Sequence, residues 1–213
     1  MDEGKILIVN LSKGLIGEEN TTLLGALMVT KIQLAAMSRA DTNPENRPPF
    51  YLYIDEFQTF STESFANILS EARKYNLNLI ITHQYIRQLT DKVKDAVFGN
   101  VGTIVSFRIG PDDASFIEKQ FVPDFDQNDL INLPNYNFYI KYLIDGMPSS
   151  AFSAIGLAPL EPYEISYKNE IVENTRSNFA KTREQVETDI KKWTSLEFVS
   201  SNVSSKIKSK TEY

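Results

Sequence analysis

The chain has 213 residues, of which 42% are hydrophobic and 11% aromatic, which is enough for one buried core. It has no cysteine and a single histidine, His83, so disulfides, thiolate metal sites and multi-histidine metal centres are excluded. The formal charge of −6 lies before Leu160, because the residues after it hold equal numbers of acidic and basic side chains. Nucleic-acid binders usually carry a basic patch, so any DNA contact needs a local patch, an oligomer lumen or further sequence.

The sequence has no feature of a membrane or secreted protein. No run of about eighteen apolar residues occurs. Residues 1–5 lack the basic and apolar regions of a signal peptide. These absences lead us to expect a cytoplasmic chain without a membrane segment of its own.

The first half of the chain alternates between strand and helix patterns. Residues 5–11 form a short apolar run rich in β-branched residues, typical of a strand buried on both faces of a parallel sheet. The expected strands are 5–11, 50–54, 77–82 and 102–108, and the expected helices are 21–39, 61–75 and a stretch ending near 98. Leu23 and Leu34 lie off the apolar stripe of the first helix, so we expect it to be covered on more than one side. This order predicts an α/β fold with a parallel sheet flanked by helices.

The pattern changes in the second half. Residues 112–121 read as a helix and residues 129–133 as a turn of one. The runs 137–145 and 150–156 are separated by a Gly-Met-Pro turn, which predicts an antiparallel hairpin.

A polar tail follows. Four apolar residues recur in it at intervals of seven, namely Val172, Phe179, Val186 and Trp193. Their narrow seam predicts one long amphipathic helix over 161–199, which either lies on its own domain or belongs to a partly disordered tail rather than a coiled coil. Residues 200–213, rich in Ser and Lys, are expected to be disordered, which leaves 1–160 as the main domain.

The strongest chemical signal is the pair Asp55-Glu56. The apolar strand 50–54 delivers these two carboxylates to the carboxyl edge of a parallel sheet, where ligands of open α/β folds bind. In a Walker B motif, the Asp helps to hold Mg²⁺ and the following Glu polarises the attacking water. A strand that runs into a solvated acidic turn has the same pattern, so the motif alone leaves both interpretations open.

Two further polar residues could take part. Gln84 follows the strand 77–82, so it falls at the same sheet edge and could orient a water or contact a γ-phosphate. Arg73 ends the helix after the acids, where it complements the helix dipole or reaches a neighbouring nucleotide as an arginine finger.

Taken together, these motifs resemble the C-terminal half of the FtsK–HerA superfamily of P-loop ATPases, and within it the type IV secretion coupling proteins (TraD/TraG-like, conjugative DNA transfer). The resemblance runs from about Gly4 to Leu160. It is carried by the segments Lys5-to-Leu11 with Ser12-Lys13-Gly14, Tyr51-to-Phe57, Ser70-to-Lys74, His83-Gln84-Tyr85 and Gly99-to-Thr103 through Phe107-Arg108.

The resemblance implies a ring, commonly a hexamer, that threads DNA through its lumen using ATP and Mg²⁺. On this sequence, Asp55 becomes the acid on the Mg²⁺ side, Glu56 the catalytic base and Gln84 the sensor. Arg73 stands where a trans-acting arginine is expected. Arg108 is a weaker candidate for a second phosphate-facing cation, and packing at a strand end explains it equally well. Coupling proteins of this kind often reach the inner face of the membrane through N-terminal helices.

One departure from the family is serious. No Gly-x-x-x-x-Gly-Lys-Ser/Thr sequence occurs, so the backbone cradle and the lysine that bind phosphates are missing. We therefore expect a truncated or split chain, a partial RecA-like sheet that is inactive without its P-loop half. In the family, the P-loop strand lies between the strands that correspond to 77–82 and 102–108. Here those strands either pair directly or leave unpaired edges, which would make the chain poorly soluble or dependent on a partner.

Two other interpretations stay open. The chain could be a catalytically silent interaction module, in which the ATPase sheet is a scaffold and the tail helix docks a partner. It could also be a different Mg²⁺-dependent α/β enzyme that uses Asp55 and Glu56, which is less favoured because no other acids or histidines cluster near them in the sequence.

Overall fold

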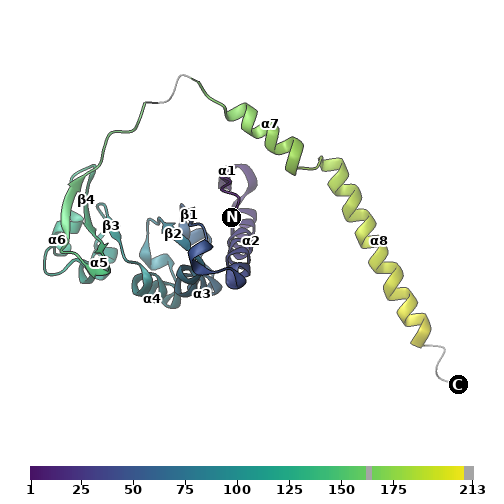
Figure 1. Cartoon of the computed structure of the whole chain (residues 1–213), viewed down its shortest axis with the longest axis horizontal. Helices are drawn as coiled ribbons and strands as arrows, with labels where there is room; N and C mark the ends of the chain where they lie inside the picture. Colours follow the sequence, from purple (N-terminus) through teal and green to yellow (C-terminus); the bar gives the residue numbers. More distant parts are fainter. Residues whose placement is uncertain (162–164, 209–213) are drawn as a thin grey trace. The chain divides into compact units, whose positions relative to one another are not determined.

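The computed structural model describes residues 1–161 and 165–208. The helices are α1 (Lys13–Ile16), α2 (Glu18–Met37), α3 (Glu63–Glu71), α4 (Asp91–Asn100), α5 (Pro111–Phe121), α6 (Gln127–Ile131), α7 (Lys168–Phe179) and α8 (Arg183–Lys208). The strands are β1 (Phe50–Ile54), β2 (Leu77–Ile81), β3 (Ile104–Ser106), β4 (Asn137–Lys141), β5 (Leu143–Ile144), β6 (Met147–Pro148) and β7 (Phe152–Ile155). Short 3-10 helices are η1 (Ser38–Asp41), η2 (Pro44–Asn46), η3 (Phe57–Thr59), η4 (Ala72–Tyr75) and η5 (Ile86–Gln88). The chain divides into two compact units, Met1–Leu157 and Ala158–Tyr213 (Figure 1).

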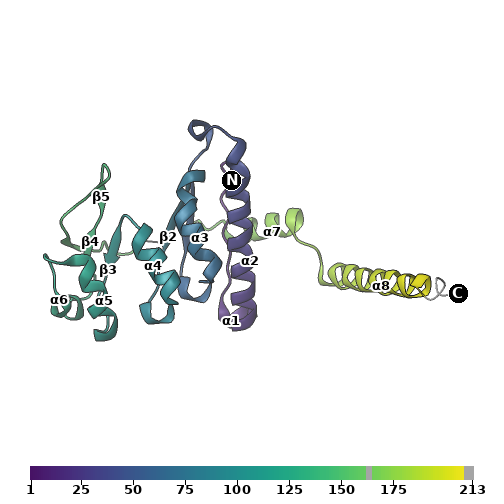
Figure 2. The ribbon, with the colours of Figure 1, turned by 90° about the horizontal axis from the view of Figure 1, so that it is seen from below.

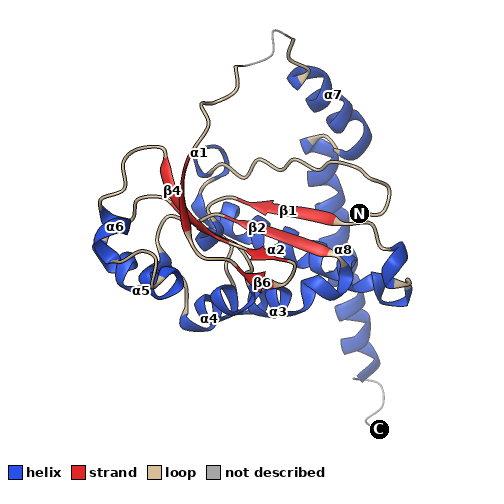
Figure 3. Cartoon of the chain, turned by 60° about the vertical axis from the view of Figure 1, so that its left-hand side comes forward, coloured by secondary structure: helices blue, strands red, loops and turns tan. Residues whose placement is uncertain are grey.

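Strands β1 and β2 form the parallel part of the first unit. They pair over their full lengths, with Phe50 opposite Leu77 and Ile54 opposite Ile81 (Figure 3). Helices α2, α3 and α4 lie side by side against this pair (Figures 1 and 2). The sequence prediction of a mixed α/β fold with two parallel strands joined through a helix is confirmed.

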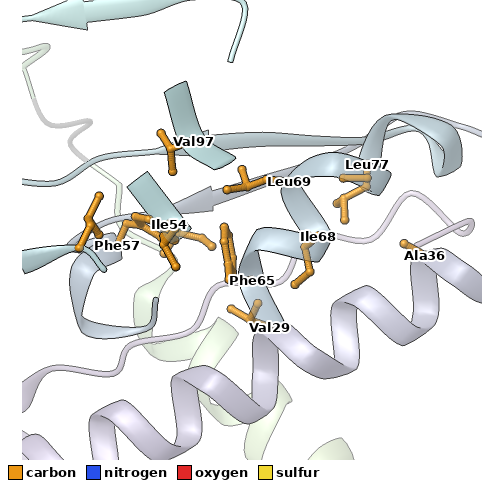
Figure 4. Close-up of a cluster of buried hydrophobic side chains, with 12 residues drawn as sticks. Val29, Ala36, Ile54, Phe57, Phe65, Ile68, Leu69, Leu77 and Val97 are labelled. Carbon is orange, nitrogen blue, oxygen red and sulfur yellow. The ribbon is translucent and has the colours of Figure 1, made fainter. Parts of the chain in front are cut away.

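The core beside this sheet is apolar and closely packed. It combines residues of α2, α3, α4, β1 and β2, including Phe65, Leu77 and Val97 (Figure 4). Phe57, which is 0% exposed, contacts Phe65 with ring centroids 4.7 Å apart. Because Phe57 directly follows the acid pair, its burial fixes the turn in which those acids stand. Truncation of a fully buried Phe typically costs about 3–5 kcal/mol.

The other face of the parallel pair is open. Side chains alternate along a strand, so Ile54 and Leu77 point into the core while their neighbours point away. Tyr51, Tyr53 and Ile80 are accordingly 57%, 72% and 36% exposed.

A second sheet is antiparallel, in the order β3–β4–β7. The pairing of β4 with β7 confirms the hairpin expected from the sequence, with the small β5–β6 pair in its connection. The prediction that residues 102–108 form a strand of the parallel sheet is wrong, because β3 pairs with β4 in an antiparallel direction. An apolar run of this length fixes neither the partner nor the direction of a strand; here the hairpin supplies the nearest edge.

One face of the second sheet is covered and one is not. Helices α5 and α6 pack on the face that carries Tyr139, which stacks on Phe125 with centroids 3.7 Å apart. On the opposite face, Val105, Ile140 and Phe152 stand in one row across the three strands. Val105 and Phe152 are 47% and 42% exposed.

Two expectations for the N-terminal region are wrong. Residues 5–11 form no strand, and Ile6 and Ile8 are 90% and 83% exposed. Apolar β-branched residues favour a strand, but a strand needs a bonded neighbour, and none of the described residues provides one. Helix α2 is covered on one side only, since Leu23 and Leu34 are 59% and 54% exposed.

Helix α2 also passes a simple test for a membrane span. The stretch Glu18–Asp41 is long and apolar enough by length and composition alone. Core helices of soluble proteins pass the same test, and one face of α2 packs into the core through Val29 and Ala36.

The second unit contains α7 and α8. The tail is helical, as expected, but two helices replace the single one, because the chain leaves the helical path at 180–182. The apolar seam is exposed, with Phe179 and Trp193 at 80% and 62%. Helix α8 continues to Lys208, where disorder was expected from residue 200, and residues 209–213 lie outside the described part of the chain.

Candidate functional site

Asp55 stands at the carboxyl edge of the parallel pair. Backbone bonds continue past the strand ends, from Thr82 N to Ile54 O at 2.9 Å and from Phe57 N to Thr82 O at 2.8 Å. Thr82 Oγ1 donates to Asp55 Oδ1 at 2.5 Å, and Glu56 N donates to the same oxygen at 3.0 Å. The end of β2 therefore holds the carboxylate that leaves the end of β1.

Glu56 adopts an unusual backbone conformation and a tightly held side chain. Its φ of 51° and ψ of 44° lie in the left-handed region, which costs a non-glycine residue roughly 1–2 kcal/mol. Gln58 Nε2 donates to Glu56 Oε2 at 2.5 Å, and Gln84 Nε2 donates to Glu56 Oε1. Both carboxylate oxygens thus accept from side-chain amides, and backbone strain of this kind is often found at functional sites.

The loop that carries Gln84 is tied to the start of α5. Arg87 forms an ion pair with Asp112 at 3.2 Å. His83 is half-buried, and its burial lowers the pKa of its imidazole, against a smaller opposing effect of Asp113. His83 is therefore favoured in its neutral form beside the site.

The two arginines expected at the site lie elsewhere. Arg73 is exposed in η4, directly before β2, and so at the edge of the sheet opposite to Asp55 and Gln84. Arg108 follows β3, and its Nη2 donates to Asn135 Oδ1 at 3.1 Å. Of the five residues expected from the sequence, the structure brings together Asp55, Glu56 and Gln84.

Gln58 and Thr82 are site residues that the sequence reasoning missed in these roles. Thr82 stood in the sequence analysis only as the last residue of the expected strand 77–82. Gln58 lies two residues beyond the acid pair, and its contact with Glu56 depends on the left-handed turn at Glu56. The contact forms because the backbone of Glu56 is left-handed. The residue types around Glu56 do not require that conformation, so no signal in the sequence marks the contact.

A cavity of about 550 Å³ lies beside the acids, between residues 9–13, helix α2 and the end of β1. Asp55 and Glu56 form part of its wall, and Lys13 is the cation among its lining residues. The rest of the wall includes apolar residues such as Met28 and Phe60. This composition does not suit a triphosphate, which needs several backbone N–H groups and cations.

The acids offer part of a magnesium site. Both hydrogen bonds to Asp55 within the described chain end on Oδ1, which leaves Oδ2 available for a cation. Mg²⁺ is usually held by one or two carboxylates together with substrate phosphates. No group of three or more acids or histidines arranged for a metal occurs among the described residues. Asp55 therefore offers one carboxylate oxygen to a magnesium ion, whose other ligands would have to be water or phosphate groups.

Comparisons with known proteins find similarities in sequence and in fold. Residues 49–119 match the family described as the TraM recognition site of TraD and TraG. The plasmid coupling protein TrwB, bound to a non-hydrolysable ATP analogue, superposes with a TM-score of 0.55 at 16% identity, covering 70% of this chain and 40% of TrwB. TrwB bound to ADP and Mg²⁺ gives a TM-score of 0.54 at 16% identity with the same coverage. No curated protein matched the sequence.

The parallel pair and the helices packed against it define an α/β domain whose fold is similar to part of TrwB. Residues 49–119, the segment that carries Asp55, Glu56 and Gln84, match the TraD/TraG family model, in line with the resemblance that the motifs of this segment indicated. The chain spans about 40% of the length of the TrwB structures that it matches.

Proposed function

We propose that this chain carries the Walker B half of an ATP-driven, DNA-translocating ATPase of the conjugative coupling kind. The observation that carries the proposal is the meeting of Asp55, Glu56 and Gln84 at the carboxyl ends of β1 and β2. Asp55 would hold Mg²⁺ through its available oxygen, and Glu56 would accept the proton of the attacking water. Gln84 would serve as the sensor of the γ-phosphate.

The residues of the chain supply positioning and a proton acceptor. Thr82 holds the Asp55 carboxylate on one side, so that its other oxygen faces a single direction. Glu56 lies next to Asp55 but stands in a left-handed turn, so its carboxylate has partners different from those of Asp55. The two acids would therefore have separate tasks, with Asp55 toward the cation and Glu56 toward the water. When bound, Mg²⁺ would offset the charge of the phosphates.

A phosphate-binding loop has to come from outside these 213 residues. The open edges of the sheets support this part of the proposal. Phe50 N donates to Asn76 O and Thr82 N to Ile54 O, so even-numbered residues of β1 and β2 face each other. Because successive residues of a parallel strand bond to opposite sides, the backbone groups of Leu79 and Ile81 point to the outer edge of β2.

Strand β3 has an open edge as well, since in the described chain β2 pairs only with β1 and β3 only with β4. Among the described residues, β2 and β3 do not pair with each other, which supports the second of the two arrangements expected from the sequence, in which strand edges stay unpaired. A strand that carries a P-loop would form hydrogen bonds with the open edge of β2 and with the open edge of β3.

The uncovered faces of the sheets also support the proposal that a P-loop half is needed. Parallel sheets of α/β proteins normally bury both faces under helices. Here Tyr51 and Tyr53 are exposed on one sheet, and Val105, Phe107 and Phe152 on the other. Helices from a P-loop half would cover such apolar faces, and burial stabilises the assembly by roughly 25 cal/mol per Å².

The remaining assignments concern the assembly. Arg73 lies at the edge opposite to the acids, so it could reach only the nucleotide of a neighbouring copy, as a trans-acting arginine in a ring would. Arg108 would be a second phosphate-facing cation after release from Asn135. DNA would pass through the ring lumen, and the ring would lie at the inner face of the membrane, anchored by other parts of the protein.

Complementation tests the proposal. A separately expressed segment that carries the P-loop is added to this chain, and ATP turnover is measured with and without DNA. We expect turnover only in the mixture, and Glu56→Gln should lower kcat by about 10²–10⁴-fold because it removes the proton acceptor. Glu45→Gln, which changes an exposed acid far from the site, is the matched control and should leave turnover unchanged.

Two outcomes would count against the proposal. Assembly of the two segments with turnover that survives Glu56→Gln would refute the assignment of the base. Assembly without any turnover would favour the second candidate, a silent module with an ATPase fold. The exposed apolar seam of the tail, with Phe179 at 80% and Trp193 at 62%, is the observation that favours such a docking role.

A further inference from the structure

The hydrogen bonds to Glu56 are asymmetric. Gln58 comes from the same short turn, two residues away, and holds Oε2. Gln84 comes from the end of a different strand, 28 residues away, and holds Oε1. The two donors therefore differ in how firmly they are fixed to the acid.

Gln58 is the fixed donor. The turn that contains it is closed by Thr59 N donating to Glu56 O at 2.9 Å, and Phe57, between the two residues, is fully buried. A carboxylate only accepts hydrogen bonds, so the amide nitrogen of Gln58 must face Glu56. This orientation leaves Gln58 Oε1 buried without a donor among the described residues, which is a cost of the bond to Glu56.

Gln84 is the exchangeable donor. Its side chain is exposed and lies in the loop after β2. Rotation of its side chain releases Glu56 Oε1 without disturbing any buried group. Glu56 Oε1 then gains a free lone pair, while Oε2 stays bonded to Gln58.

We propose that Gln58 is a positioning residue, which anchors Glu56 Oε2 so that Oε1, once Gln84 turns away, is the oxygen that accepts the proton of the attacking water. The inference deepens the proposed function and rests on it for its catalytic meaning. The step balances: the water would lose one proton to Oε1, its oxygen would bond to the γ-phosphorus, and the bond from that phosphorus to the bridging oxygen of the departing ADP would break. Gln58 touches Glu56 and no reacting atom.

The first test needs neither nucleotide nor partner. Side-chain amide resonances of Gln58 and Gln84 are recorded by ¹H–¹⁵N NMR on the full chain and assigned with Gln58→Met and Gln84→Met. Glu56→Ala should shift both amides and speed their hydrogen exchange, with Gln58 the more protected in the parent chain. Thr82→Val, which removes the neighbouring bond to Asp55, should leave the Gln58 amide in place. A Gln58 amide that ignores Glu56→Ala would overturn the proposal.

The second test uses the complemented ATPase. Gln58→Met keeps the volume of the side chain and removes its donor. It should lower kcat by about tenfold to a hundredfold, as misplacement of a catalytic group does, and leave the KM for ATP unchanged. A raised KM with unchanged kcat would overturn the positioning role.

The two tests separate the inference from the proposed function. The Gln58 amide could respond to Glu56→Ala as expected while the mixture of this chain with the P-loop segment shows no ATP turnover. That outcome would refute the proposed function and the catalytic meaning of the contact. Turnover with a Gln58 amide insensitive to Glu56→Ala would refute the inference alone.

Discussion

Glu56 combines a strained backbone with a side chain held at both oxygens. The strain and the hydrogen bonds can be separated by replacing Glu56 with two residues that lack the carboxylate. Alanine keeps the strain of the left-handed turn, and glycine relieves it.

We expect Glu56→Gly to be more stable than Glu56→Ala by about 0.5–1 kcal/mol, measured by urea denaturation. The left-handed conformation costs alanine roughly 1–2 kcal/mol, and the greater freedom of glycine in the unfolded chain offsets about half of this. Ala26→Gly in helix α2 is the control and should destabilise by about 1 kcal/mol. Equal stability of the two Glu56 variants would show that the turn is not left-handed in solution.

His83 should make stability depend on pH. Burial depresses the pKa of its imidazole in the folded state below its ordinary value of 6.5. Between the folded and the ordinary pKa, the unfolded chain binds more protons than the folded chain, so the free energy of unfolding falls as pH decreases through this window. Thermal unfolding from pH 8 to pH 5 should show this loss, and His83→Gln should reduce it. An identical pH profile for the variant would contradict the depressed pKa.

At the scale of elements, α2 is positioned by a close approach at Gly25. A Cβ at this position would lie 2.0 Å from Phe60 Cδ1. Gly→Ala inside a helix normally stabilises by about 1 kcal/mol, but here we expect Gly25→Ala to destabilise by about 1–3 kcal/mol through overpacking. Urea denaturation measures the change, and a Phe60→Leu background should reduce it.

Gly99 provides the matched control for this prediction. It also lies in a helix, α4, but a methyl group added at Gly99 would have no neighbouring atom within 4 Å. Gly99→Ala should therefore be neutral or stabilising. A loss at Gly99 as large as that at Gly25 would show that the contact with Phe60 is not the cause.

At the scale of the whole molecule, the open strand edges and uncovered apolar faces predict self-association. Val105 is 47% exposed on the uncovered face of the antiparallel sheet. We expect the sedimentation coefficient of the chain to rise with concentration, and Val105→Lys to reduce the rise because a charge on this face opposes stacking. Leu160→Lys changes an exposed apolar residue off the sheet, and should have little effect. A monodisperse chain at high concentration would contradict this prediction.

The local sequence determined the strands β1 and β2, the helices between them and the hairpin of β4 and β7, because each has a clear apolar period. It also determined that Asp55 and Glu56 leave a strand end, and that Gln84 follows the next strand. Parallel strands meet at one edge, so the proximity of these residues followed from the pattern alone.

Only the tertiary structure decided which strands pair and which faces stay open. Residues 5–11 have the composition of a strand but no bonded neighbour in the described chain, and β3 joins the hairpin instead of the parallel pair. The contact of Gln58 with Glu56 depends on a left-handed turn that surrounding packing imposes. Pairing and backbone strain are set by contacts between residues distant in the chain, and a local period of apolar residues carries no information about them.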